Sequence, residues 1–376
     1  MAGAWHLYVH IPFCTRKCRY CDFYSVQCDP ALVKRYVEAV VREWRMVRKR
    51  HVLGDETPET IYFGGGTPSV LSVEQWEALV HGLGISSAVE WTLECNPESF
   101  DDVKVRAWTG AGVNRLSLGV QSLRERELRL LGRQHTAEQA CRALRDPAVE
   151  RFASVGVDVM YGLPGQRMGD VLETLEQLIR MPRLEHISAY ELTLSPHSPL
   201  GRHRRLLPLP DEDRVVAMYH GIEQALTAAG FEHYEVSNYA RPGHRSRHNS
   251  AYWRHEPYVG LGPGAHSYVP PERRANVADV GEYVASVARG RLPVAFAETL
   301  ARDELVREAL MLGLRTVDGI DDIRFMAITG ESLTAGERGR QLERLVAGGL
   351  LRRCGSTYVP TGDGMLRADA LAARLS

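Results

Sequence analysis

The chain has 376 residues, of which 44% are hydrophobic and 25% are charged, and its formal net charge is −1. This composition is typical of a globular protein with one large and one smaller domain, and the near-neutral charge excludes a protein whose overall field attracts nucleic acid. The sequence contains no apolar run of about 18 residues, the length that would predict a membrane-spanning helix. We therefore expect any membrane contact to be peripheral. The first residues lack the features of a secretory signal, and we expect a cytoplasmic protein.

Three closely spaced cysteines follow the first predicted strand, at residues 5–12. Cys14, Cys18 and Cys21 have the spacing Cys-x3-Cys-x2-Cys on one short loop. Soft thiolates favour iron–sulfur clusters, zinc or copper(I). Three thiolates can hold three irons of a cubane cluster and leave the fourth iron open to a small molecule. The pattern therefore favours a [4Fe-4S] cluster that can bind a ligand directly.

Zinc and disulfides are the alternatives for these cysteines. A structural zinc site needs four ligands; Cys28 or His10 could complete one, but no second Cys-x2-Cys pair follows. Seven cysteines are an odd number, and no secretory signal precedes them, which disfavours disulfides. We interpret the four cysteines outside the triad as ordinary thiols: Cys28, Cys95, Cys141 and Cys354.

Strand-like and helix-like segments alternate over the first two thirds of the chain. Alternation of this kind predicts a parallel sheet with right-handed crossovers. Six units instead of the eight of a closed barrel favour an α/β fold with a partial, open (β/α)6 barrel of TIM-like form. The strands are predicted at residues 5–12, 60–63, 89–93, 115–120, 156–160 and 187–192, and long helices at 31–52 and 73–83.

Glycine and polar residues stand at the carboxyl ends of these strands, where a barrel carries its active site. Residues 64–67 read GGGT, and their backbone can approach a ligand closely. Glu94 suits an amino group, Gln121 ends the next strand, Arg133 suits a carboxylate, and Asp158 suits ribose hydroxyls. Together they would bind S-adenosylmethionine, whose amine and carboxylate can chelate the open iron. Each residue alone could equally be a strand-end cap or an ion-pair partner.

The pattern changes after residue 210. A helix at 211–230 and a strand at 231–240 precede a polar, histidine-rich stretch at 241–268, and Pro270, Pro271 and Gly290 indicate a linker. Helices at 302–316 and 337–347 and a hairpin at 350–360 predict a small, mainly helical module like a winged helix. We therefore expect a barrel at 1–230, a barrel extension at 231–290 and a C-terminal domain at 291–376.

The motifs together resemble a known family. Cys14-x3-Cys18-x2-Cys21 followed by GGGTP is similar to the radical S-adenosylmethionine superfamily. The strings YVHIPFC, CDFYS, YFGGGTPS, ECNPES, RLSLGVQS, LGRQHT and DVMYGLPGQ resemble the branch that contains oxygen-independent coproporphyrinogen III oxidase (HemN) and its heme-chaperone relatives, over nearly the whole chain. The resemblance implies a cluster on the three cysteines and an S-adenosylmethionine site made of Tyr8, Tyr20, Gly65, Gly66, Thr67, Glu94, Gln121, Arg133 and Asp158.

Two features distinguish the branches. The oxidase resembles this chain around the cluster but has a further cysteine two residues after the third, where this chain has Phe23. Residues 248–253, HNSAYW, resemble a motif of the heme-chaperone group, and they make His248 a candidate axial ligand for heme iron. In the alternative interpretation His248 caps a surface turn and the aromatic residues fill core. His244, His255 and His266 are rival ligands, and His10 is more plausibly structural.

The resemblance implies a heme chaperone that binds heme, a [4Fe-4S] cluster and S-adenosylmethionine and transfers heme to an acceptor protein. The alternative is oxidative decarboxylation of coproporphyrinogen III, an activity we do not expect, and a zinc-stabilised binding module is a third class. Expected partners are heme, an electron donor and a heme acceptor, for which a respiratory protein is one candidate; no nucleic acid is expected. The sequence leaves open the acceptor, the covalency of heme attachment and the oligomeric state.

Overall fold

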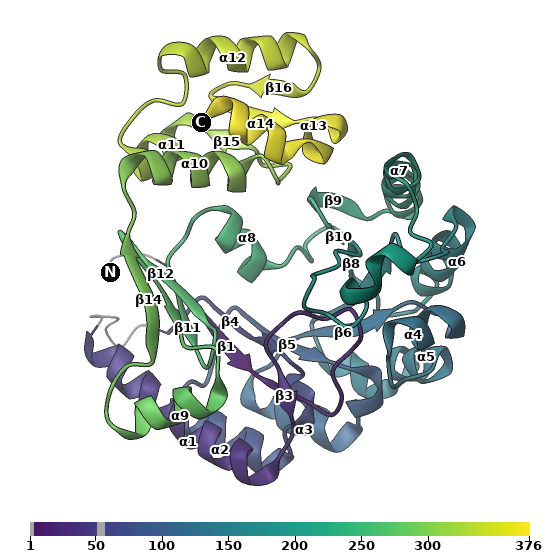
Figure 1. Cartoon of the computed structure of the whole chain (residues 1–376), viewed down its shortest axis with the longest axis vertical. Helices are drawn as coiled ribbons and strands as arrows, with labels where there is room; N and C mark the ends of the chain where they lie inside the picture. The colour runs from purple at the N-terminus through teal and green to yellow at the C-terminus, as the bar shows by residue number, and fades with distance from the viewer. Residues whose placement is uncertain (1–3, 51–56) are drawn as a thin grey trace.

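The computed structural model describes residues 4–50 and 57–376. Within these residues, six parallel strands lie in chain order and form the curved centre of a larger sheet (Figure 1). Each overlaps a strand predicted from the sequence, so the partial (β/α)6 barrel is confirmed. The strands are β1 (His6–Ile11), β4 (Thr60–Gly65), β5 (Glu90–Cys95), β6 (Arg115–Gln121), β7 (Ser154–Tyr161) and β8 (His186–Glu191).

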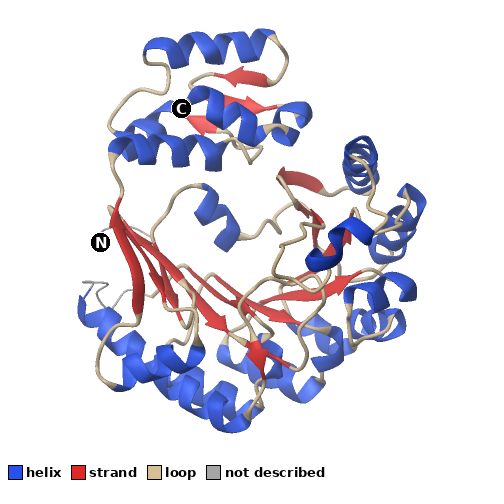
Figure 2. Ribbon diagram, viewed as in Figure 1, coloured by secondary structure: helices blue, strands red, loops and turns tan. Residues whose placement is uncertain are grey.

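Helices cover the convex side of the sheet (Figure 2). The helix predicted at 73–83 begins at a capping box between Ser72 and Gln75 and ends at Gly84, which has a left-handed φ of 63°. The last two residues of the helix predicted at 31–52 lie outside the described residues. The helices are α1 (Pro30–Arg50), α2 (Val73–Leu83), α3 (Asp102–Ala111), α4 (Glu125–Leu131), α5 (Ala137–Arg145), α6 (Met168–Ile179) and α7 (Glu212–Ala228).

Side chains of the barrel strands alternate between an apolar outer face and a polar inner face, because successive residues of a strand point to opposite sides. On the outer face, Phe63 packs 4.9 Å from Trp76 of α2, measured between ring centroids, and Trp91 packs on both. The register pairs Tyr8 with Tyr62 and Tyr62 with Thr92, which places polar residues of neighbouring strands in rows. The inner face carries His6, Tyr8, His10, Thr60, Tyr62, Thr92, Glu94, Ser117, Asp158, Ser188 and Tyr190.

Further strands extend the sheet at both edges. β11 (Tyr258–Leu261) pairs parallel with β1, and the antiparallel strands β12 (His266–Val269), β13 (Glu272–Asn276) and β14 (Val294–Thr299) follow it. The linker predicted around Pro270 and Pro271 is therefore wrong: these prolines form the turn of the β12–β13 hairpin. At the other edge, the single strand predicted at 231–240 is two antiparallel strands, β9 (Glu232–Glu235) and β10 (Asn238–Ala240), because β10 turns back to pair with β8.

Two more helices belong to this part. α9 (Val280–Ala288) packs against α1 on the outside of the sheet. α8 (Arg247–Trp253) contains the HNSAYW residues and lies on the concave side, between the sheet and the C-terminal domain (Figure 1). Two short strands, β2 (Phe13–Cys14) and β3 (Val26–Gln27), pair with each other and hold the two ends of the cysteine loop together.

The C-terminal domain has its own apolar core and a three-stranded sheet in the order β15-β17-β16. Its first six elements run helix, strand, helix, helix, strand, strand, as in a winged helix, which confirms that prediction. They are α10 (Arg302–Gly313), β15 (Ile320–Asp321), α11 (Asp322–Thr329), α12 (Gly336–Ala347), β16 (Leu351–Cys354) and β17 (Thr357–Pro360), followed by α13 (Gly362–Leu366) and α14 (Ala368–Leu375).

Strand β14 bears on where the domains divide. It pairs with β13 as the edge strand of the large sheet, although the sequence predicts a boundary between residues 290 and 291. The separate core of the C-terminal domain begins at Val306. We therefore propose a division near Leu300, immediately after β14. None of the described helices combines the length and apolar character needed to cross a bilayer.

Candidate functional site

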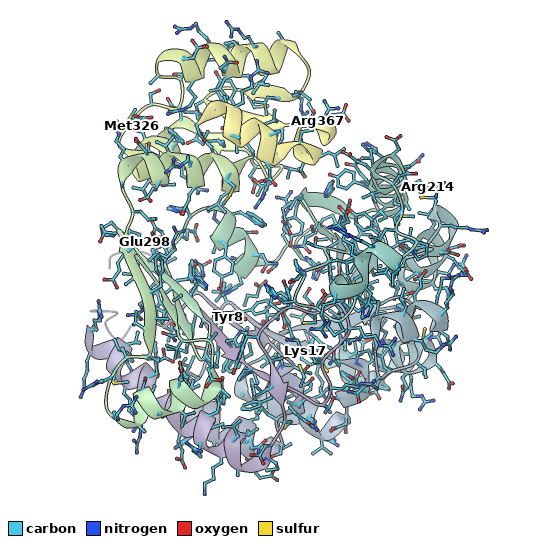
Figure 3. All side chains as sticks on the ribbon, viewed as in Figure 1. Tyr8, Lys17, Arg214, Glu298, Met326 and Arg367 are labelled. Atoms are coloured by element: carbon cyan, nitrogen blue, oxygen red, sulfur yellow. The ribbon has the colours of Figure 1, made fainter. Side chains whose placement is uncertain are left out.

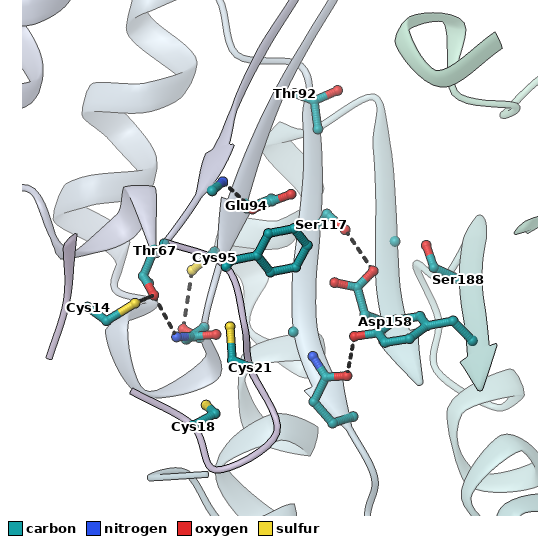
Figure 4. A pocket seen from close by; sticks show the side chains of 18 of the residues that line it. Cys14, Cys18, Cys21, Thr67, Thr92, Glu94, Cys95, Ser117, Asp158 and Ser188 are labelled. Atoms are coloured by element: carbon teal, nitrogen blue, oxygen red, sulfur yellow. Dashed lines mark hydrogen bonds between the residues drawn. The ribbon is translucent and has the colours of Figure 1, made fainter. Parts of the chain in front are cut away.

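A cavity of about 580 Å³ lies over the inner faces of β4 to β8 and is closed on one side by the cysteine loop. The close-up shows the three cysteines on one side, Asp158 on the other and Glu94 between them (Figure 4). The structure thus brings together eleven of the residues predicted from the sequence. They are Cys14, Cys18, Cys21, Tyr20, Gly65, Gly66, Thr67, Glu94, Gln121, Arg133 and Asp158.

The cysteine loop is fixed to the barrel at several points. The Sγ atom of Cys14 lies 3.4 Å from Oγ1 of Thr67, which follows β4 and also accepts a hydrogen bond from Asn96. The backbone N–H of Arg19 donates to the carbonyl oxygen of Leu131, at the end of α4, over 2.9 Å. These contacts hold the thiols at the carboxyl ends of β4 to β6, where the strand-to-helix loops meet.

The donor set of the loop fits a cubane cluster. In residues 4–50 and 57–376, no three His, Cys, Asp or Glu side chains converge closely enough to hold a single metal ion. The three thiols line one wall of the cavity, and three thiolates that each bind a different iron are the donor set of a cubane cluster with one open iron. Burial raises the pKa of the Cys14 thiol, and it raises that of Cys21 to about 11. Iron must therefore displace protons from these thiols when it binds.

Arg133 contacts the cluster loop. The sequence predicts that Arg133 pairs with a ligand carboxylate, but its guanidinium donates to Sγ of Cys18 at 3.4 Å and, at 2.6 Å each, to Asn96 Oδ1 and the Gly119 carbonyl. Its buried Nε–H has no hydrogen-bond partner among the described residues. The positive charge of Arg133 therefore lies against the sulfur of Cys18 at the edge of the cluster loop.

Glu94 and Asp158 are half-buried carboxyls without a cationic partner within ion-pair distance among the described residues. Glu94 accepts hydrogen bonds from the Tyr62 hydroxyl at 2.7 Å and the Gly65 N–H at 3.1 Å, and burial raises its pKa to about 7. Asp158 accepts a hydrogen bond from the Ser117 hydroxyl at 3.3 Å, and burial raises its pKa to about 6. Glu94 suits an ammonium group, and Asp158, farther from the cysteines, suits hydroxyl groups.

Gln121 is placed by an unusual backbone. Its φ of 68° is left-handed, a conformation that is uncommon for residues other than glycine. At this point the pairing of β6 with β7 shifts register, so the end of β6 bends out of the regular ladder. The side chain of Gln121 accepts a hydrogen bond from the Tyr190 hydroxyl at 2.7 Å and is held against the cavity.

Tyr8 and His248 are the two predicted residues that the structure does not place in this cavity. Tyr8 lies on the concave face (Figure 3) and lines a neighbouring cavity, with its hydroxyl 3.0 Å from Nδ1 of His10. His248 is 1% exposed, and its ring nitrogens lie 2.7 Å from Oγ1 of Thr60 and 2.9 Å from the hydroxyl of Tyr252. Burial lowers its pKa to about 3. Because both nitrogens are engaged and the ring is enclosed, the geometry argues against His248 as an iron ligand.

Several residues of the cavity lining were not predicted. Asn96 connects Thr67 with Arg133, and Ser117 and Ser188 lie beside Asp158 on the inner face. The alternation of side chains along the strands could have identified the two serines. Ser117 is the register partner of Glu94 and Ser188 is that of Asp158, so each serine points to the same face of the sheet as its partner. Asn249, the second residue of the HNSAYW motif, also reaches the cavity from α8, although the sequence proposed only His248 of that motif as a ligand.

A partial barrel with three cysteines and these strand-end residues defines a radical S-adenosylmethionine protein. The Radical SAM superfamily model matches residues 8–178, and the HemN C-terminal domain model matches residues 300–367. Heme chaperone HemW of Lactococcus lactis is 36% identical over 83% of this chain and 82% of its own, and that of Mycobacterium tuberculosis is 35% identical over 98% and 94%. The chain therefore belongs to the HemW family.

The fold has a solved counterpart. The coproporphyrinogen III oxidase HemN of Escherichia coli superposes with a TM-score of 0.84 at 21% sequence identity, over 99% of this chain and 90% of that one. At this level of identity the likeness establishes the fold, and it does not assign a reaction.

Proposed function

We propose that the protein is a heme chaperone, which carries a [4Fe-4S] cluster and S-adenosylmethionine in the first cavity, binds heme and passes it to an acceptor protein. The observation that carries this choice over porphyrin oxidation is Phe23. It stands where the resembling oxidases have a fourth cysteine, it is 65% exposed, and it borders the cavity beside Cys21. The HemW name of the relatives supports the same choice.

In this proposal the cluster is held by Cys14, Cys18 and Cys21. The carboxylate of Glu94 accepts a hydrogen bond from the amino group of S-adenosylmethionine. The carboxylate of Asp158 accepts hydrogen bonds from the hydroxyl groups of the ligand. The guanidinium of Arg133 balances part of the negative charge of the thiolates that bind the cluster. When bound, the cluster supplies redox chemistry to the bound S-adenosylmethionine. The surrounding residues orient that ligand and keep it between the cysteine loop and the inner faces of β5 to β7. An electron donor and a heme acceptor are the partners that the proposal requires, in the cytoplasm.

Heme binding and porphyrin oxidation can be measured on one sample of the full chain, purified and reconstituted without oxygen. We expect iron and acid-labile sulfide without zinc, saturable binding of hemin seen as a shifted Soret band, and no conversion of coproporphyrinogen III to protoporphyrinogen. The same sample should transfer heme to a heme-free acceptor protein. Sustained decarboxylation would replace the proposal with the oxidase alternative, and zinc without sulfide would favour a binding module.

The pH dependence of S-adenosylmethionine binding provides a test of Glu94. Because its pKa is about 7 in the folded protein and the carboxylate is the form that accepts hydrogen bonds from the amino group of the ligand, affinity should rise with pH, by roughly tenfold between about pH 6 and pH 8. Without ligand the sign is opposite: the folded state holds a proton that the unfolded state has released, so stability falls as pH rises from about 4.5 to about 7. Titration calorimetry and urea unfolding measure the two trends.

Glu94→Gln should weaken the binding and flatten its pH dependence, since an amide does not ionise. Glu138→Gln on the exposed face of α5 is the matched control and should retain both trends. An unchanged pH profile in Glu94→Gln would show that another group accepts the amino group.

A further inference from the structure

A second cavity of about 550 Å³ adjoins the first on the concave face of the sheet. Strands β1, β11, β12 and β13 provide one wall, and α8 and α10 provide the other. Phe23 of the cluster loop lines both cavities, so they meet at the position that distinguishes this chain from the oxidase. The volume lies within the range of sites that enclose a cofactor-sized ligand.

Aromatic rings dominate the walls of this second cavity. Tyr258 and Tyr268 are directly opposed across β11 and β12, with ring centroids 6.5 Å apart, and the Tyr252 ring of α8 lies 4.6 Å from that of Tyr258. Tyr8 and Tyr24 complete the lining from the barrel and the cysteine loop. The Tyr252 and Tyr258 rings are nearly perpendicular, at 78°, and the Tyr258 and Tyr268 rings are tilted by 47°, so together they offer ring faces and edges against which an apolar macrocycle can pack.

Three histidines also line the cavity, and they differ in which nitrogen is free. His10 has Nδ1 against the Tyr8 hydroxyl and Nε2 3.4 Å from the Tyr24 carbonyl oxygen. His255 has Nε2 3.1 Å from Glu308, and its Nδ1 is buried without a partner in the described chain. The His266 side chain forms no hydrogen bond or ion pair with any described residue and is exposed at the cavity.

His266 is well placed to bind an iron centre. It lies two residues before Tyr268 on β12, so both side chains project from the same face of the strand. Burial and the nearby charge of Arg273 lower the pKa of His266, which favours the neutral imidazole that binds metals. Met311 of α10, 37% exposed at the same cavity, indicates an opening to solvent through which heme could enter.

We propose that this second cavity holds the macrocycle of heme and that His266 supplies an axial nitrogen to its iron, a proposal that rests on the heme-binding function proposed above. A neutral imidazole would donate the lone pair of one ring nitrogen to the iron, and this bond requires no other group to change. Arg273 already forms ion pairs with Glu298 and Glu308. We therefore do not propose that it binds a propionate group of heme.

The test is hemin titration of the reconstituted full chain, followed by absorption spectroscopy. His266→Ala should weaken hemin binding by roughly tenfold, change the Soret and visible bands to those of iron lacking that ligand, and retain normal iron and sulfide in the cluster. Added free imidazole should restore the original spectrum, a rescue that a purely structural role of His266 would not give. His220→Ala on α7, where the side chain is 44% exposed, should behave as the unaltered protein.

A second variant tests the cavity while leaving the proposed iron ligand, His266, unchanged. Leu312→Trp on α10 places extra volume in the cavity and should weaken hemin binding with His266 intact, whereas Leu312→Met should not. Unchanged binding in both His266→Ala and Leu312→Trp, with loss in His248→Ala or His255→Ala, would overturn this inference and leave the proposed function standing. Failure of the unaltered protein to bind hemin would instead contradict the proposed function itself.

Discussion

Replacing Cys18 with alanine should eliminate the cluster and, with it, the binding of S-adenosylmethionine. The three thiols of the loop line the cavity together with Cys95 of β5, and the loop from Cys14 to Cys21 has no fourth cysteine that can take the place of a lost one. The two remaining thiols, Cys14 and Cys21, have pKa values raised by burial, so without the third ligand they stay protonated and bind iron poorly. Arg133 would at the same time lose its sulfur partner and retain its hydrogen bonds to Asn96 and to the Gly119 carbonyl oxygen.

Iron and sulfide analysis after anaerobic reconstitution, together with the visible absorption of the cluster, measures this loss. Cys354→Ala is the matched control, because that thiol is exposed on β16 in the C-terminal domain, far from the cavity lining. Cys354→Ala should retain full iron, and Cys18→Ala should retain almost none. Full iron content in Cys18→Ala would mean that a residue outside the predicted triad binds the cluster.

The parts of the site that sequence could predict are those encoded locally. Cysteine spacing, strand periodicity and the residues after each strand depend on neighbours in the chain, and parallel strands bring their carboxyl ends to one edge. This is why Glu94 and Asp158, 64 positions apart by their numbers, could be assigned to one cavity before the fold was known. The alternation of polar and apolar residues along the strands identifies every side chain on the inner face of the barrel, including those that the motifs do not single out.

The remaining features depend on contacts between distant segments. The hydrogen bond from Arg133 to Cys18 spans 115 positions, and nothing near either residue indicates it. His248 reads as a free ligand in its own segment, but Thr60, 188 positions earlier, engages its ring in the folded chain. Likewise, Pro270 and Pro271 resemble a linker locally, and only the pairing of β12 with β13 makes them a hairpin turn. Tertiary contacts therefore decided which histidine is free.

Gly66→Ala should disrupt the cavity at the junction between β4 and the cysteine loop. The N–H of Gly66 donates to the Ile11 carbonyl oxygen at 2.8 Å, and a Cβ atom at position 66 would lie 2.8 Å from that oxygen and 2.8 Å from the Phe13 carbonyl oxygen. Backbone atoms cannot rotate away as a side chain can, so β4 and the residue preceding Cys14 must separate. We expect stability to fall by about 2 kcal/mol, as in overpacked cores, and both cluster content and S-adenosylmethionine affinity to fall strongly.

Gly110→Ala on α3 separates this steric effect from the general effect of replacing glycine. A Cβ at position 110 meets nothing within 4 Å, and alanine favours helix over glycine by about 1 kcal/mol, so Gly110→Ala should be as stable as the original or more so, with normal cluster content. Urea unfolding and iron analysis of the two variants compare them directly. If Gly66→Ala kept its cluster and stability, the cysteine loop would have to tolerate displacement, and the fixed position of Cys14 beside Thr67 would not be required for cluster binding. Loss of the cluster at unchanged stability would instead mean that Gly66 sets the position of the loop and adds little to the stability of the barrel.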